Sequence, residues 1–454
     1  MNTPTRVDVA IVGAGTAGMA AYRAARAHTE SVLLIEAGPG GTTCAREGCM
    51  PSKLLIAAGD AAHAIVQAPN FGVHGGPPHV DGAAVMARVR SERDRFVGFV
   101  LDTIQSWPDA HRLTGTARLL APGQLDVDGR RIDARAVVWA TGSASHVEPA
   151  WRAALGERLI TSEAVFEWTD LPASVAVLGT GTIAIELAQA LHRLGVRVRV
   201  FGRSPRVGPL TDPDLQAQAV AVFSQELPLT LSPEPLQLGR DGHQAVVQGE
   251  RFDWVLAATG RSPNLAGLVA PDLPRDARGH LPYDAATGQV ADLPLFLAGD
   301  VSEHRPLLHE AADAGRIAGD NAARWPDVQA QTRRTPLGVV FSEPQMTLAG
   351  QSHRALTQAG KAFATGRVGF ANQGRSRVML QNVGALHVYG EPGSGRLLGA
   401  EMLGPAAEHI GHLLAWSVQR GDTVAQMLAY PYYHPVIEEG LRTALQDLQM
   451  QIKA

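Results

Sequence analysis

The sequence predicts a three-layer α/β protein with two similar βαβ units and a C-terminal α+β domain. Two apolar strands each run into a Gly-rich turn and a helix, one within residues 7–28 and the other within 175–194. Strands at 137–142 and 254–260 both end in Ala-Thr-Gly, one after each unit. After about Arg333 the chain has no further turn of this kind, which indicates a separate last domain.

Composition narrows the class of protein. A chain of 454 residues predicts about three domains, and 45% hydrophobic with 19% charged residues is typical of a globular protein. The net charge of −4 gives no electrostatic reason to expect nucleic acid or an anionic membrane as partner. No apolar run approaches the roughly 18 residues that span a bilayer, and no signal peptide precedes the first strand. We therefore expect a soluble, cytoplasmic protein.

The first βαβ unit carries a Gly-rich turn of known chemistry. The strand at 7–12 leads directly into Gly13, Gly15 and Gly18, and after the helix a second strand ends at Glu36. Glycines at this spacing let the backbone approach a pyrophosphate, whose charge the helix N-terminus favours. An acid at the end of the second strand can accept hydrogen bonds from ribose hydroxyls. The unit is therefore predicted to be a Rossmann-like dinucleotide-binding domain.

The pattern recurs in the second unit. The strand at 175–178 leads into Gly179 and Gly181, a helix continues to about Leu194, and residues 196–201 form the next strand. One Gly-rich turn can reflect close packing of a helix on a strand, but two complete copies indicate two dinucleotide sites. An enzyme that passes electrons between two such cofactors needs this arrangement.

The two Ala-Thr-Gly strands suggest the domain limits. We expect the first dinucleotide-binding domain over 1–143, with a return segment over 263–333 that includes the apolar strand ending at Asp300. The second domain is expected over 144–262 and the last over 334–454.

Only two cysteines occur, Cys44 and Cys49, five positions apart. In a reducing compartment such a pair is more often catalytic or metal-binding than structural, and two thiolates alone cannot fill a tetrahedral zinc site. A short structural staple and two inert thiols remain alternatives. Positions i and i+5 lie too far apart on a regular helix for a disulfide, so bridging needs a distorted segment, for which Gly48 supplies latitude. Lys53 places a positive charge nearby, which favours a thiolate.

The run at 40–53 reads G-G-T-T-C-A-R-E-G-C-M-P-S-K. In this run the sequence resembles the class I pyridine nucleotide–disulfide oxidoreductases, and most of all dihydrolipoamide dehydrogenase. The resemblance covers essentially the whole chain, with the motifs in the family's order. These are the two Gly-rich turns, the cysteine run, Ala258-Thr259-Gly260-Arg261, Ala298-Gly299-Asp300 and His434-Pro435.

The resemblance implies FAD as the bound cofactor and gives roles to the site residues. Cys44 exchanges with the substrate, whereas Cys49 lies against the flavin. Lys53 sits near the flavin ring and pairs with Glu186, and Asp300 holds the ribityl chain. Further cofactor contacts are expected at Gly13, Gly15, Gly18, Glu36, Thr42, Thr141, Gly142, Gly179, Gly181 and Gly260.

Near the end, His434 and Glu439 keep the spacing of the family's H-P-T-x-x-E pattern, although Val436 replaces the threonine. Thiol–disulfide exchange needs a proton acceptor and donor, and a histidine near neutrality can be both. A carboxylate behind it fixes the tautomer and raises the pKa of the histidine. The resemblance implies a homodimer in which this histidine serves the active site of the other subunit.

The nucleotide preference departs from the dihydrolipoamide dehydrogenase pattern. Gly202 occupies the position where an acid usually binds the ribose 2′-hydroxyl of NAD, and Arg203 and Arg206 follow. An arginine there accommodates the 2′-phosphate of NADP. The missing acid favours NADP(H), although incidental surface arginines remain an alternative.

The motifs allow several interpretations of the substrate. The Pro-Ser-Lys ending at 51–53 favours a lipoamide-type dithiol, whereas Gly202-Arg203 leans towards an NADPH-dependent disulfide reductase of the glutathione reductase type. Mercuric reductases and large thioredoxin reductases need a C-terminal redox pair, and residues 449–454 hold no cysteine. A redox-sensing flavoprotein without turnover is disfavoured, because a sensor needs no proton shuttle. The direction of the reaction and membership of a multienzyme complex are not encoded in these motifs.

Overall fold

The computed structural model describes residues 4–453 apart from 233, 277–280 and 303–304. The chain divides into two units. The first unit takes residues up to 51, 88–146 and 261–334, and the second takes 52–87, 147–260 and 335 onward. The chain therefore returns to the first unit twice.

A seven-stranded sheet forms the centre of the first unit, in the order β3-β2-β1-β6-β5-β4 with β17 paired to β6. Its strands are β1 (Thr5–Val12), β2 (Val32–Glu36), β3 (Arg112–Thr114), β4 (Ala117–Ala121), β5 (Gln124–Val127), β6 (Arg130–Trp139) and β17 (Leu295–Leu297). Five strands pair in parallel, whereas β4 and β5 add antiparallel pairs. Residues 9–12 of β1 are buried, which explains their unbroken apolar run.

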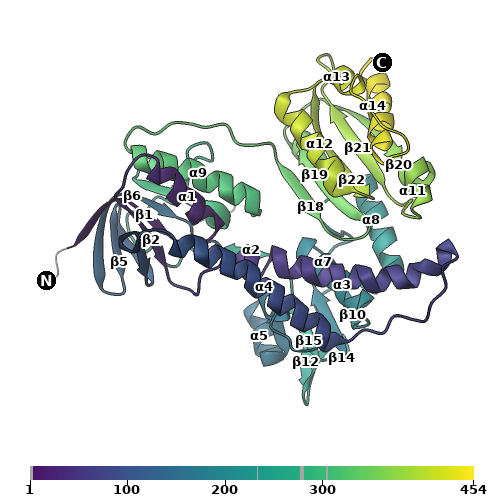
Figure 1. Ribbon diagram of the computed structural model, residues 1–454, viewed down its shortest axis with the longest axis horizontal. Helices are drawn as coiled ribbons and strands as arrows, with labels where there is room; N and C mark the ends of the chain where they lie inside the picture. The colour runs from purple at the N-terminus through teal and green to yellow at the C-terminus, as the bar shows by residue number, and fades with distance from the viewer. Residues whose placement is uncertain (1–3, 233, 277–280, 303–304, 454) are drawn as a thin grey trace. The chain divides into compact units, whose positions relative to one another are not determined.

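Helices α1 (Thr16–Arg26) and α9 (Leu308–Arg324) lie side by side in this unit (Figure 1). Two glycines of α9 permit the contact. A Cβ on Gly315 would lie 2.1 Å from the carbonyl oxygen of Ala17, and one on Gly319 would lie 2.2 Å from that of Ala21. The helices also share an apolar cluster with β1, β2 and β6, so α1 and its Gly-rich turn are held firmly on the sheet.

The second unit contains a parallel sheet in the order β11-β10-β9-β15-β8. Its strands are β8 (Leu159–Thr161), β9 (Ser174–Leu178), β10 (Arg197–Gly202), β11 (Leu229–Leu231) and β15 (Trp254–Ala257). Helix α7 (Thr182–Arg193) connects β9 to β10, which completes the predicted βαβ unit. An antiparallel sheet of β12 (Leu238–Asp241), β13 (Gln244–Val247) and β14 (Glu250–Phe252) is inserted before β15.

The C-terminal part of this unit is an antiparallel sheet with helices, in the order β18-β19-β22-β21-β20. Its strands are β18 (Leu337–Val340), β19 (Gln345–Gly350), β20 (Ala364–Gly369), β21 (Ala385–Gly390) and β22 (Leu397–Gly404). Helices α12 (Ala407–Arg420) and α14 (Glu438–Lys453) pack on the sheet through a shared apolar cluster (Figure 1).

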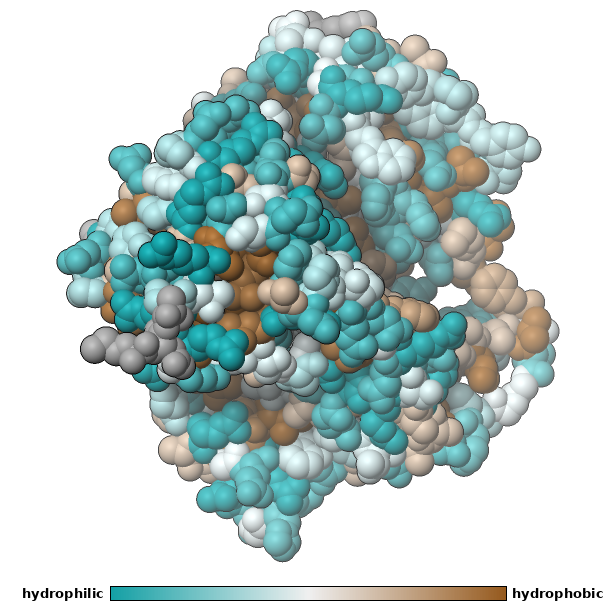
Figure 2. All heavy atoms as spheres, turned by 60° about the vertical axis from the view of Figure 1, so that its left-hand side comes forward, coloured by the Kyte–Doolittle hydropathy of each residue, from teal (hydrophilic) through white to brown (hydrophobic). Residues whose placement is uncertain are grey.

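The predicted fold class is confirmed: two Gly-rich βαβ units are followed by an α+β region. On the face that Figure 2 turns forward, hydrophilic side chains predominate and hydrophobic ones gather in smaller areas. Over the described ranges, we find no helix with the length and hydrophobicity needed to cross a membrane.

Candidate active site and cofactor sites

The first Gly-rich turn has the geometry that a pyrophosphate requires. Gly13 has a φ of +101°, and a Cβ there would lie 2.4 Å from the carbonyl oxygen of Ala140. A Cβ on Gly18 would lie 1.8 Å from the carbonyl oxygen of Gly13, whereas one on Gly15 would meet nothing within 4 Å. Two glycines therefore serve close packing, and Gly15 leaves open space at the start of α1. These features fit an FAD pyrophosphate at this turn.

Glu36 ends β2 beside this turn. Its Oε2 accepts a hydrogen bond from Ala14 N at 2.7 Å, and its Oε1 accepts one from Gly38 N at 2.7 Å. These bonds fix the orientation of the carboxylate next to the turn. Its contact with a ribose stays a prediction.

The second turn repeats this geometry at the start of α7. Gly179 has a φ of +116°, and a Cβ there would lie 2.3 Å from the carbonyl oxygen of Ala258. A Cβ on Gly181 would meet nothing within 4 Å. The third position of the pattern is Ala184, which is fully buried. The residues present therefore fit a second dinucleotide.

The cysteine segment departs from a regular helix, as the sequence predicts for a pair that can bridge. Helix α2 ends at Arg46, and α3 (Cys49–Gln67) starts three residues later. A Cβ on Gly48 would lie 3.0 Å from Thr43 O and 3.4 Å from Cys44 Cα, so the glycine allows a close approach between the turn and α2. Cys44 is half-buried and Cys49 is exposed. The disulfide between them stays a prediction.

Thr42 precedes this segment in a strained conformation, with φ 58° and ψ 146°. Its hydroxyl oxygen accepts a hydrogen bond from Ala45 N at 3.2 Å, which caps α2. Arg46 Nε donates to the carbonyl oxygen of Gly40 at 2.9 Å and ties the end of α2 to the preceding glycines. Local contacts thus fix the cysteine segment on both sides of Cys44.

Lys53 and Glu186 meet, although they belong to α3 and α7. Lys53 Nζ lies 2.8 Å from Glu186 Oε2, and the Glu186 side chain is only 5% exposed. Phe341 N donates to the other carboxylate oxygen at 2.8 Å, and the Phe341 ring centroid lies 4.6 Å from Lys53 Nζ. Phe341 was not predicted as a site residue, because no motif in the sequence links it to Lys53.

Asp300 follows β17 within the 3₁₀ turn Gly299–Ser302. Its Oδ2 accepts a hydrogen bond from the Ser143 hydroxyl at 2.8 Å. Ser143 lies on β7 (Ser143–Ser145), which pairs with β16 (Arg261–Pro263) in an antiparallel ribbon. Each of these short strands directly follows one of the Ala-Thr-Gly turns. The repeated motif was therefore a usable signal for Ser143 and Arg261, which the sequence analysis did not place in a site.

Other residues of the two Ala-Thr-Gly turns lie beside the same ribbon. The Thr141 hydroxyl donates to the carbonyl oxygen of Asn264 at 2.7 Å, and Asn264 N donates to the carbonyl oxygen of Gly142 at 3.0 Å. Gly142 and Gly260 have φ values of +68° and +121°, which favour glycine. Their contacts with cofactors stay predictions.

His434 and Glu439 form a hydrogen-bonded pair. His434 Nδ1 lies 3.0 Å from Glu439 Oε1, and the main-chain N–H of Val436 donates to Glu439 Oε2 at 3.2 Å. The hydrogen bond with His434 lowers the pKa of Glu439, and the bond from Val436 adds to this effect. The His434 side chain is 79% exposed, so its own chain does not enclose the imidazole.

Gly202 ends β10, where an acid would bind the ribose of NAD. A Cβ there would lie 2.7 Å from Thr180 Cγ2 and 2.9 Å from Leu231 Cδ2. The space beside Gly202 is therefore filled, and a longer side chain would have to displace its neighbours. Arg203 and Arg206 follow and are exposed.

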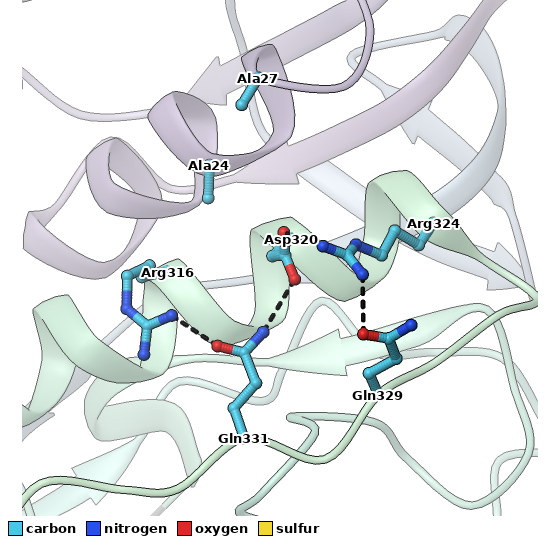
Figure 3. Close-up of a pocket in the computed structure, with 7 residues that line it drawn as sticks. All are labelled: Ala24, Ala27, Arg316, Asp320, Arg324, Gln329 and Gln331. Atoms are coloured by element: carbon cyan, nitrogen blue, oxygen red, sulfur yellow. Dashed lines mark hydrogen bonds and ion pairs between the residues drawn. The ribbon is translucent and has the colours of Figure 1, made fainter.

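A pocket of about 400 Å³ in the first unit is lined by none of these residues (Figure 3). Its polar side chains bond one another across α9 and the segment that follows it. Arg316 Nη1 donates to Gln331 Oε1 at 2.5 Å, Gln331 Nε2 donates to Asp320 Oδ2 at 2.8 Å, and Arg324 Nη1 donates to Gln329 Oε1 at 2.8 Å. This mutual pairing indicates a structural network. Among the described residues, no group of three or more His, Cys, Asp or Glu side chains is arranged to hold a metal ion.

Two nucleotide turns and an intervening cysteine pair are typical of flavin-dependent redox enzymes. The chain belongs to the pyridine nucleotide-disulphide oxidoreductases: that family matches residues 7–315, and its dimerisation domain matches residues 337–445. This confirms the resemblance found in the sequence. The family uses FAD and a pyridine nucleotide, and the chain is thus a flavoprotein oxidoreductase acting on a disulfide or sulfur group.

Individual relatives carry different names. A mercuric reductase from Streptomyces lividans is 29% identical over 99% of this chain and 97% of its own length. A dihydrolipoyl dehydrogenase from Bacillus subtilis is 26% identical over 97% and 98%. Among solved structures, LpdA from Mycobacterium tuberculosis has a TM-score of 0.82 at 23% identity, covering 97% of this chain and 99% of that chain. The HOCl-induced flavoprotein disulfide reductase RclA from Escherichia coli has a TM-score of 0.79 at 21% identity, with coverage of 97% and 99%. The last two similarities show the fold alone.

Proposed function

We propose that this chain is a dihydrolipoamide dehydrogenase-like enzyme that moves two electrons between a substrate dithiol and NAD(P) through a Cys44–Cys49 disulfide. The net reaction converts dithiol and NAD(P)⁺ to disulfide, NAD(P)H and a proton. The proposal depends mainly on the break between α2 and α3. Because of this break, the two cysteines, which are five positions apart, are not held at the distance that a regular helix would impose. FAD, when bound, supplies the electron transfer between the dithiol and the nicotinamide.

The chain's own residues account for the thiol chemistry. A substrate thiolate attacks Cys44, and Cys49 leaves as a thiolate; the second substrate thiol then displaces Cys44 and leaves as the substrate disulfide. Lys53, one helical turn after Cys49 on α3, favours the thiolate form by its charge. Glu186 and Phe341 hold this lysine in one orientation. His434 accepts the proton of the attacking substrate thiol, and Glu439 fixes its tautomer.

The proposed enzyme is a homodimer with shared active sites, in which His434 serves Cys44 of the other subunit. The match to the family's dimerisation domain supports a homodimer. The high exposure of His434 agrees with a role outside its own chain. A groove of about 400 Å³ is lined by Trp416 and by two residues shortly before His434 in the sequence, Tyr430 and Tyr433. The side chains of Trp416 and Tyr433 are 60% and 81% exposed. Large exposed aromatic residues of this kind are typical of a surface that a second copy covers.

The proposed nucleotide is NADP(H). The packing of Thr180 and Leu231 around Gly202 disfavours the carboxylate that selects NAD, and the exposed Arg203 can meet a 2′-phosphate. The same observation favours a second candidate function, an NADPH-dependent disulfide reductase of the glutathione reductase type. The two candidates share the redox core and differ in substrate.

Steady-state assays of the purified holoenzyme separate these candidates. Dihydrolipoamide is offered with NAD⁺ or NADP⁺, and NADPH is offered with oxidised glutathione or with Hg(II). We expect fastest turnover with dihydrolipoamide. Faster reduction of oxidised glutathione would show that glutathione, and not a lipoamide-type dithiol, is the substrate. Oxidation of NADPH that depends on Hg(II) would contradict the proposed dithiol–disulfide reaction. Cys49→Ser should abolish the long-wavelength absorbance of the two-electron-reduced holoenzyme, and a band that persists would contradict the role of Cys49.

A further inference from the structure

Each Ala-Thr-Gly turn is followed by one strand of the same short ribbon, β7–β16, which lies beside Asp300. The chain leaves the first unit after residue 146 and returns at residue 261. Strand β7 comes just before the exit, and β16 begins at the return, so the crossover strands pair with each other. The hydroxyl of Ser143 on this ribbon donates to a carboxylate that follows a third strand, β17. The ribbon is therefore well placed to control the orientation of Asp300.

Arg261 engages Ser143 through two separate atoms of its guanidinium. Arg261 Nε donates to the Ser143 hydroxyl oxygen at 2.8 Å, and Nη2 donates to the Ser143 carbonyl oxygen at 2.6 Å. A third contact joins Nη1 to the Ser145 hydroxyl oxygen at 3.3 Å. A planar guanidinium bound at several points has little freedom to rotate.

The direction of these bonds follows from the chemistry of the groups. An arginine has donors only, so the Ser143 oxygen must accept from it. The single proton of the hydroxyl is then available for Asp300, whose ionised carboxylate only accepts. Arg261 thus aligns Ser143, and Ser143 holds Oδ2 of Asp300. The other carboxylate oxygen, Oδ1, can accept from a ligand hydroxyl.

We propose that Ser143 and Arg261 are positioning residues for FAD: together they orient Asp300 to accept from the hydroxyls of the ribityl chain. The inference rests on the proposed role of Asp300 in holding that chain. Ser143 and Arg261 are the residues that directly follow the two Ala-Thr-Gly turns. Neither residue needs to touch the flavin, because both act through the carboxylate.

The test measures the rate at which FAD dissociates from the diluted holoenzyme, followed by the recovery of flavin fluorescence. Asp300→Asn is the reference variant. We expect Ser143→Ala and Arg261→Gln each to accelerate dissociation about tenfold, as for loss of a hydrogen bond to a charged group. Ser145→Ala is the matched control, since it removes a bond to the same arginine without touching Ser143, and it should change the rate less than twofold.

A double variant separates positioning from general loosening. If Ser143 acts through Asp300, then adding Ser143→Ala to Asp300→Asn should accelerate dissociation no further. The melting temperature of the apoprotein should change little in Ser143→Ala. Full additivity, or equal effects of Ser143→Ala and Ser145→Ala, would overturn the positioning role while leaving the proposed function intact. Unchanged FAD dissociation in Asp300→Asn would overturn both the inference and the proposed role of Asp300.

Discussion

Lys53 Nζ lies 2.8 Å from Glu186 Oε2, although 133 residues separate the two along the chain. The carboxylate is nearly fully buried, and its second oxygen accepts from Phe341 N. The charge of Glu186 is thus compensated from two directions, by a cation and by a main-chain donor. A buried carboxylate that loses its cation is costly, because its charge is then left in a poorly solvated place.

Removing the positive charge of Lys53 should destabilise the second unit, to which Lys53 and Glu186 both belong. We expect Lys53→Ala to lower the free energy of unfolding by about 2 kcal/mol, because Glu186 keeps its burial and loses its partner. Lys53→Arg retains the charge and should lose less than about 1 kcal/mol. Urea unfolding of the three proteins at one pH measures the difference. Equal losses for the two variants would contradict the argument that the charge at position 53 stabilises the buried carboxylate.

Gly48 should control the geometry of the cysteine segment. In Gly48→Ala the new methyl group would lie 3.0 Å from Thr43 O, so α2 must shift and carry Cys44 with it. We expect reduction of the flavin by substrate dithiol, followed by stopped-flow absorbance, to slow about tenfold.

Gly98 provides the control for that substitution. It lies within helix α4 (Gly82–Gln105), and a Cβ there would meet nothing within 4 Å. Gly98→Ala should leave the rate unchanged and raise stability by about 0.5–1 kcal/mol, because alanine loses less backbone freedom in a helix. A rate equal to wild type in Gly48→Ala would contradict the proposed constraint.

A buried pair outside the redox site should govern stability in acid. Asp212 Oδ2 lies 2.8 Å from His387 Nδ1 and also accepts from the hydroxyl of Tyr389. Burial acts to raise the pKa of Asp212, but hydrogen bonds and the charge of His387 outweigh it and lower the pKa to about 2. Because the folded pKa lies below the unfolded value of about 3.9, the stabilisation is present above that value and is lost as the pH falls towards 2.

The shift corresponds to a contribution of about 2–3 kcal/mol to stability above the unfolded pKa of Asp212. We expect the urea midpoint of the wild type to fall more steeply between pH 5 and about pH 2 than that of Asp212→Asn, which cannot ionise. Asparagine can still cap α8 (Pro213–Glu226), as Asp212 does through its Oδ1. Parallel pH profiles for the two proteins would contradict the prediction.

The nucleotide site offers a test with an internal control. If Arg203 meets the 2′-phosphate, then Arg203→Ala should raise the KM for NADPH about tenfold and leave the KM for NADH nearly unchanged. Equal kcat values would show that only binding is altered. An equal rise of KM for both nucleotides would show that Arg203 contacts a part of the molecule common to NADPH and NADH. The argument for NADP(H) would then be lost.

Local sequence patterns predicted the fold well because they reflect local geometry. Gly18 is required by a contact with the backbone of Gly13 in the same turn, and a break near Gly48 was expected because two cysteines five positions apart cannot bridge within a regular helix. Contacts between distant segments left no such pattern. Phe341 reaches Glu186 through its main-chain N–H, which any residue except proline supplies, so its identity could not reveal the contact.

A main-chain N–H also supports the histidine–glutamate pair, at a position where the side chain departs from the family pattern. Val436 stands where the family usually has threonine, yet its main-chain N–H donates to Glu439 Oε2. We therefore expect Val436→Thr to leave turnover within about twofold of wild type, whereas His434→Gln should remove most turnover while FAD stays bound. Glu439→Gln should lower kcat/KM, because the imidazole would lose the carboxylate that fixes its tautomer and orientation. The measurements are steady-state rates across pH together with the flavin absorbance of each purified variant. Near-full activity of His434→Gln would exclude this histidine as the proton acceptor, and a large loss in Val436→Thr would show that the side chain at 436, and not its backbone, holds the pair.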